Sequence, residues 1–153
     1  MHDDRTFGTR RPPQDEPAAG TPSSRACDGP GVLVVNDDVL MRLMLRAGLE
    51  QHGLPVWLAA GAGEAASVYR AHANRIAVVL IDVETEDGLK ALAALRGVSP
   101  GVRVCFVGGA GKYDPDVFCG ASRLAWPFLM SDLAATIRRV ARAAPSPAAG
   151  RLA

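Results

Sequence analysis

Five short apolar runs, separated by segments with helical periodicity, are the feature that most constrains this fold. The runs lie at 31–35 (GVLVV), 56–60 (VWLAA), 76–83 (IAVVLIDV), 102–107 (VRVCFV) and 123–126 (RLAW). Most of them are apolar without interruption instead of alternating with polar residues. Strands buried on both faces of a parallel sheet have this pattern, because helices cover both sides.

The segments between the runs predict helices. They cover residues 38–52, 62–74, 88–97, a short stretch at 114–120, and 131–144. In the first helix, four apolar residues share one face and three charged residues share another: Leu40, Leu43, Met44 and Ala47, against Arg42, Arg46 and Glu50.

The last predicted helix has the clearest amphipathic pattern. Its apolar residues recur at steps of four, three and four: Leu133, Ile137, Val140 and Ala144. Ser131 stands where a hydroxyl can cap the first turn. We therefore expect this helix to pack one face against the sheet.

Strands that alternate with helices predict an α/β domain with a flavodoxin-like, doubly wound, five-stranded parallel sheet. The expected strand order is 2-1-3-4-5, with helices on both faces. The folded domain is expected over 31–144. Residues 1–30 contain five prolines and few large apolar residues, and residues 145–153 are similar, so both are predicted to be disordered tails.

Composition excludes several classes of protein. The net charge of +1 provides no basic surface for nucleic acid. No apolar stretch approaches the ~20 residues of a membrane span, and the N-terminus lacks a secretory signal, so a cytoplasmic location is expected. The three cysteines, Cys27, Cys105 and Cys119, form no C-x-x-C pair, which argues against a disulfide framework or a zinc site.

The carboxyl ends of the predicted strands carry the residues of chemical interest. Asn36 and Asp37 follow the first strand, and Asp82 ends the third. In the order 2-1-3-4-5 these strands are neighbours, so Asp37 and Asp82 should converge on one crevice. Two close carboxylates repel unless a cation joins them, and Mg²⁺ accepts such oxygen ligands. A carboxylate can also attack phosphorus and form an aspartyl phosphate.

Three strand-end motifs resemble the receiver domain of two-component response regulators: VLVVNDD, VVLIDVETEDGL and WPF. The resemblance covers about residues 31–142. It implies that Asp82 accepts phosphate from a histidine kinase or a phosphotransfer protein, which is a signalling role and not that of an enzyme. It also implies Mg²⁺ binding by Asp37, Asp82 and the backbone carbonyl of Glu84, and we expect this binding to be weak because Asn36 offers a neutral oxygen.

The same resemblance makes two further expectations. Receivers commonly hold the peptide bond before the strand-five proline in cis, which would be Trp126–Pro127 here. They also often form homodimers or bind partners through the last helix and strand. In this chain that helix carries Arg138, Arg139 and Arg142.

Three positions depart from the family pattern. The first strand usually ends in two acids, but here the first of them is Asn36. The fourth strand usually ends in Thr or Ser, but here Gly108 has no hydroxyl. A Lys usually precedes the strand-five proline, but here Trp126 carries no charge. The missing groups would weaken the stabilisation of an aspartyl phosphate by about 2–4 kcal/mol.

Three interpretations therefore stay open. The chain is a receiver phosphorylated on Asp82, a degenerate receiver that binds a protein independently of phosphate, or a dinucleotide-binding enzyme. The last rests on GAGEAA at 61–66, which matches the G-x-G-x-x-[GA] fingerprint with Asp82 about twenty residues on. Glu64 argues against it, because it would place a negative charge beside the pyrophosphate. Intact-mass measurement after incubation with a phosphodonor separates the first two.

Overall fold

The computed structural model describes residues 28–82, 84–108, 122–125 and 127–143. It contains five strands: β1 (Gly31–Val35), β2 (Val56–Ala59), β3 (Ile76–Asp82), β4 (Val104–Val107) and β5 (Ser122–Leu124). It contains four described helices: α1 (Val39–Gln51), α2 (Ala62–His72), α3 (Glu86–Val98) and α4 (Met130–Arg142). The predicted tails at 1–30 and 145–153 lie almost entirely outside the described residues, as does the helix predicted at 114–120.

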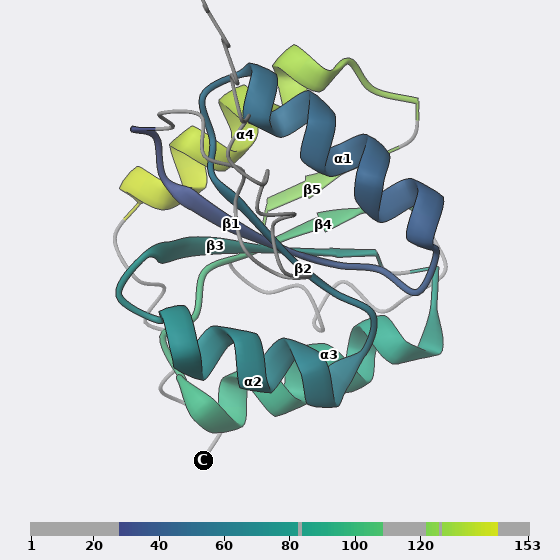
Figure 1. The fold of residues 1–153 in the computed structure, drawn as a ribbon, viewed down its shortest axis with the longest axis vertical. Helices are drawn as coiled ribbons and strands as arrows, with labels where there is room; N and C mark the ends of the chain where they lie inside the picture. The colour runs from purple at the N-terminus through teal and green to yellow at the C-terminus, as the bar shows by residue number, and fades with distance from the viewer. Residues whose placement is uncertain (1–27, 83, 109–121, 126, 144–153) are drawn as a thin grey trace, which may run out of the picture.

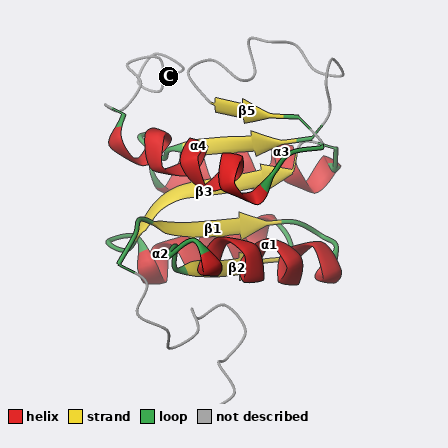
Figure 2. Cartoon of the chain, turned by 90° about the horizontal axis from the view of Figure 1, so that it is seen from above, coloured by secondary structure: helices red, strands yellow, loops and turns green. Residues whose placement is uncertain are grey.

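The sheet is parallel throughout and has the predicted order, β2-β1-β3-β4-β5. Figure 2 shows the five strands pointing in the same direction in this order. The flavodoxin-like fold class is thus confirmed. The order places β1 beside β3, so the residues that follow these two strands meet at one edge of the sheet.

The sheet separates α1 and α4 on one face from α2 and α3 on the other (Figure 1). A hydrophobic core lies on each side of it. Successive side chains of a strand point to opposite faces. In β1, Leu33 and Val35 contribute to the core beneath α2 and α3, and Val32 and Val34 to the core beneath α1 and α4. Each strand therefore needs apolar residues at almost every position, which explains the uninterrupted runs in the sequence.

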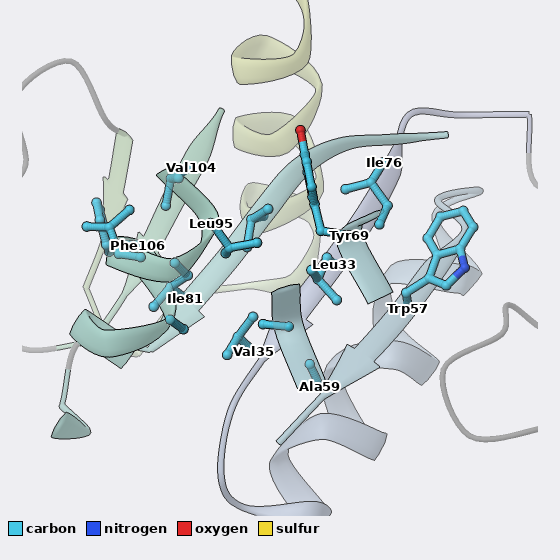
Figure 3. Close-up of a cluster of buried hydrophobic side chains, with 14 residues drawn as sticks. Leu33, Val35, Trp57, Ala59, Tyr69, Ile76, Ile81, Leu95, Val104 and Phe106 are labelled. Atoms are coloured by element: carbon cyan, nitrogen blue, oxygen red, sulfur yellow. The ribbon is translucent and has the colours of Figure 1, made fainter. Parts of the chain in front are cut away.

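The core beneath α2 and α3 extends from Trp57 to Phe106 (Figure 3). Trp57 is fully buried, with the guanidinium of Arg75 5.3 Å from its ring centroid and the His72 ring tilted against it. Its indole N–H has no hydrogen-bond partner among the described residues. Such a group is costly to bury, so packing around the ring must supply the compensating free energy.

Helix α1 does not pack on the sheet through the apolar face identified in its sequence. Leu45 and Leu49 are fully buried, whereas Leu40 is 73% exposed and Leu43 is 51% exposed. Leu45 and Leu49 form the side of α1 that faces the sheet, and long polar side chains flank it. Among these, Arg42 donates from Nη1 to the carbonyl of Asn36 at 2.7 Å. Arginine stems cover apolar surface while their heads bond elsewhere, which allows this face to pack.

Helix α4 packs as predicted, with Leu133, Ile137 and Val140 buried. The prediction that Ser131 caps the helix is wrong. The N-cap residue is Leu129, whose side chain makes no capping bond, and Ser131 lies exposed inside the first turn. The first-turn N–H groups of Asp132 and Leu133 bond to the Leu129 carbonyl instead, so the helix begins without a side-chain cap.

Helix α3 begins at Glu86, two residues before the predicted start. Thr85 is its N-cap and accepts a bond from the Gly88 N–H at 3.2 Å. Asp87 therefore belongs to the first turn of a helix, where negative charge is favourable. None of the helices within the described ranges is long and apolar enough to cross a membrane.

Candidate functional site

The candidate site lies where β1 and β3 end side by side. Val35 pairs with Ile81 in the parallel ladder, so Asn36 and Asp82 follow at the same level. The Asn36 amide nitrogen donates to Asp82 Oδ2 at 3.1 Å. The sequence predicted that strand-end residues converge here, and Asn36 makes the direct contact with Asp82.

The orientation of the Asn36 side chain is determined by its second bond. Its Oδ1 accepts from the backbone N–H of Asp38 at 2.8 Å, so its nitrogen must face Asp82. Asn36 is only 3% exposed. A buried amide with both ends bonded is held rigidly, and the Asp82 carboxylate is held with it.

The other oxygen of Asp82 is bonded as well. Asp82 Oδ1 accepts from the backbone N–H of Glu84 at 2.9 Å, and Thr85 Oγ1 donates to the Asp82 carbonyl at 3.3 Å. A Cβ at Gly88 would lie 2.1 Å from the Asp82 carbonyl oxygen, so only glycine permits this approach of α3. The start of α3 therefore positions Asp82 through Glu84, Thr85 and Gly88.

The environment of Asp82 raises its pKa above the ordinary value of 3.8. Burial is the largest cause, and the nearby carboxylates of Glu84 and Asp37 add to it by repulsion. The bonds from the Glu84 N–H and from Asn36 act in the opposite direction. Asp82 is thus a half-buried carboxylate under the influence of two further negative charges.

Gly108 directly follows β4 and lies next to this carboxylate. Its φ of +93° is a conformation that side-chain-bearing residues rarely adopt. A Cβ there would lie 3.1 Å from Glu84 Cγ and 3.2 Å from Asp82 Oδ1. The Glu84 side chain therefore takes up the space that a side chain at position 108 would need.

The carboxylates around Asp82 fit Mg²⁺ in part. This cation needs only one or two carboxylates and keeps several waters, and Asp37 and Asp82 supply such ligands. Across the described ranges, no group of three or more His, Cys, Asp or Glu is arranged to hold a metal ion. The Asn36 amide hydrogen, which points at Asp82 Oδ2, is the feature that opposes a cation.

Solved structures provide the comparison with known proteins. A response regulator receiver domain from Clostridium thermocellum superposes with a TM-score of 0.65 and 24% identity, over 73% of this chain and 94% of the other. The chemotaxis protein CheY4 from Vibrio cholerae gives 0.65 and 25%, over 73% and 98%. The chain has the receiver-domain fold.

A third structure with this fold is a CheX–CheY complex from Borrelia burgdorferi with BeF₃ and Mg²⁺. It has a TM-score of 0.64 and 24% identity, over 72% of this chain and 88% of the other. No protein-family model matches the sequence. No curated protein matches it either.

The third departure, Trp126, falls outside the described residues, so neither its side-chain position nor the cis geometry expected for Trp126–Pro127 is described. Pro127 itself is exposed. Of the three positions that depart from the receiver pattern, Asn36 and Gly108 lie among the described residues.

The receiver-domain fold also bears on the dinucleotide interpretation. GAGEAA follows β2, which is an edge strand. A Cβ added at Gly61 or Gly63 would meet no atom within 4 Å, so no close backbone approach requires these glycines. Glu64 accepts from the Ala60 N–H at 3.1 Å and places its carboxylate at the start of α2. An anionic pyrophosphate is disfavoured there.

Sequence reasoning missed the parts of the site that hold Asp82 in place. Thr85 is of a residue type favoured at helix N-caps, and it could have located the start of α3. The donation from Asn36 to Asp82 depends on the register of β1 and β3, which sequence alone does not provide. The packing of Glu84 against Gly108 had no sequence signal.

Proposed function

We propose that this chain is the receiver module of a two-component phosphorelay and that Asp82 accepts the phosphoryl group. The donor would be a phosphohistidine of a histidine kinase or phosphotransfer protein, which places the chain in the cytoplasm. The observation that carries the proposal is Asp82 itself, a half-buried carboxylate at the carboxyl end of β3. Parallel sheets commonly bind ligands at this edge.

In this transfer, one Asp82 oxygen attacks phosphorus and the bond from phosphorus to the donor histidine nitrogen breaks. The electron pair returns to the imidazole, and the chain gains one acyl phosphate. The Glu84 N–H fixes Oδ1, and Oδ2, once released from Asn36, is the oxygen that can attack phosphorus. Mg²⁺ held by Asp37, Asp82 and the Glu84 carbonyl would neutralise the charge of the phosphoryl group.

A second candidate is a degenerate receiver that binds a partner without phosphate. Two observations favour it. Asn36 supplies Asp82 with a neutral donor, so the carboxylate is satisfied without a metal. The Glu84 side chain packs against Gly108, so a negative charge already stands beside Asp82.

Phosphorylation by a small phosphodonor distinguishes the two candidates. The full chain is incubated with acetyl phosphate and Mg²⁺, and intact mass is recorded over time. We expect slow or partial gain of one phosphoryl group, and none in Asp82→Asn. Asp37→Asn is the matched control, because it removes one carboxylate but leaves the acceptor, and should react more slowly. A wild-type chain that never reacts supports the degenerate receiver.

A further inference from the structure

The electrostatic field around the Asp82 carboxylate is negative. Asp37 is exposed after β1, and Glu84 is exposed after β3. Both carboxylates contribute by repulsion to the raised pKa of Asp82, and the contribution of Glu84 is the larger. A small charged molecule that reaches the half-buried Asp82 must cross this field, and a field of one sign changes the encounter rate of charged molecules.

The cation Arg42 also contacts this edge of the sheet, through a bond from its Nη1 to the carbonyl of Asn36 at 2.7 Å. Within the described ranges, however, the charged groups that shift the pKa of Asp82 are Glu84 and Asp37. Both are anionic, so a molecule that carries more negative charge is repelled more strongly from Asp82.

The Glu84 side chain lies beside Asp82, in the space next to Gly108. A Cβ at Gly108 would lie 3.2 Å from Asp82 Oδ1 and 3.3 Å from Glu84 Cδ, so both of these atoms lie within 3.3 Å of one point. The backbone N–H of Glu84 also donates to Oδ1 at 2.9 Å, which fixes where this side chain starts. A phosphoryl donor at Asp82 is therefore close to the negative charge of Glu84.

We infer that Glu84 determines which phosphodonors react with Asp82, selecting against acyl phosphates and in favour of donors with a phosphorus–nitrogen bond. This inference rests on the proposed function. Acetyl phosphate is a dianion at neutral pH, whereas phosphoramidate is protonated on nitrogen and is a monoanion. The Glu84 carboxylate repels the dianion more strongly, so Glu84 is a specificity-determining residue and not a catalytic one.

The two donors lead to the same product. In each reaction Asp82 Oδ2 attacks phosphorus and forms the acyl phosphate. With phosphoramidate the phosphorus–nitrogen bond breaks and its electron pair leaves on nitrogen, as ammonia. With acetyl phosphate the phosphorus–oxygen bond breaks and its electron pair leaves on acetate. The donors therefore differ in the charge that passes Glu84 and in the leaving group, and only the first depends on residue 84.

The test is the rate of phosphorylation of the full chain by each donor, followed by intact mass at one Mg²⁺ concentration and one ionic strength. The measured quantity is the acetyl phosphate rate divided by the phosphoramidate rate. Both rates come from the same protein, so a general change in the reactivity of Asp82 cancels. Glu84→Gln should raise this ratio by about twofold to fivefold, and Glu84→Lys should raise it further. The gain should shrink with added salt, because Glu84 is exposed.

Asp87→Asn is the matched control. Asp87 is an exposed acid in the first turn of α3, and it is not among the groups that shift the pKa of Asp82, so its removal should leave the ratio unchanged. A ratio that is equal in wild type, Glu84→Gln and Glu84→Lys overturns donor selection and leaves the proposed function intact. A control that changes as much as Glu84→Gln also overturns it. If neither donor labels any of these proteins, the proposed function fails and the inference fails with it.

Discussion

Replacing Asn36 by Asp tests the core of the candidate site, because it turns the hydrogen bond to Asp82 into a contact between two carboxylates. The atoms concerned are 3.1 Å apart. Two unit charges at that distance repel by about 5 kcal/mol at an effective dielectric constant of about 20. The lost bond to a charged group adds about 1.5–3 kcal/mol.

Proton uptake limits this cost. The pair can bind one proton and share it, as close carboxylates do. Holding a proton at about pH 7 on a group with an ordinary pKa near 4 costs about 4 kcal/mol, at 1.36 kcal/mol per unit. We therefore expect Asn36→Asp to lower the free energy of unfolding by about 2–4 kcal/mol at neutral pH without metal. The loss should shrink as the pH falls towards 4, since the proton becomes freely available.

The assay is urea denaturation in EDTA and in Mg²⁺. A cation between the two carboxylates should recover about 2.7 kcal/mol at a hundred times its dissociation constant. Asn36→Ala is the matched control, because it loses the same bond without adding charge, and it should gain no more from Mg²⁺ than wild type. If Asn36→Asp matches Asn36→Ala in EDTA and gains nothing from Mg²⁺, the two side chains are not neighbours and the site is wrong.

Four further measurements have defined outcomes. The stability of Asp82→Asn relative to wild type should fall as the pH drops from about 7 towards 3.8, because the raised pKa makes the ionised carboxylate of wild type costly to fold and this cost disappears as the carboxyl is protonated; a pH series of denaturation curves measures it, and a constant difference would contradict the raised pKa. Gly108→Thr should cost about 1–3 kcal/mol in the same assay, because its φ is +93°, and an unchanged midpoint would contradict this. Leu45→Ala should cost about 2–5 kcal/mol and Leu43→Ala little, since only Leu45 is buried, and equal losses would refute the assigned helix face. Burial raises the Cys105 pKa to about 12, so mass spectrometry should find this thiol unlabelled by iodoacetamide until the chain unfolds.

The fold was predictable because nearly every residue of the strands is apolar, and only a sheet covered on both faces buries such strands. The same argument failed for α1, which has apolar residues on more than one side. Leu45 and Leu49 form the buried stripe, but Leu40, Leu43 and Met44 are equally apolar. Periodicity identifies apolar faces, and the contacts of the folded chain decide which of them packs.

The sequence predicted which strand ends come together at the candidate site. Strand ends and strand order bring Asp82 to the edge that Asn36 and Asp37 share. The hydrogen bonds between them were not predictable, because they depend on ångström-scale register and on the Asn36 rotamer. The space beside Gly108 also depends on where the Glu84 side chain lies.

The conformation of Gly108 couples this position to Glu84. A threonine or serine at position 108 requires the backbone to leave its φ of +93° and the Glu84 side chain to move away. The cost of a hydroxyl-bearing residue at position 108 therefore depends on which residue stands at position 84. Substitutions at the two positions should be non-additive, and a smaller side chain at position 84 should make a side chain at position 108 less costly.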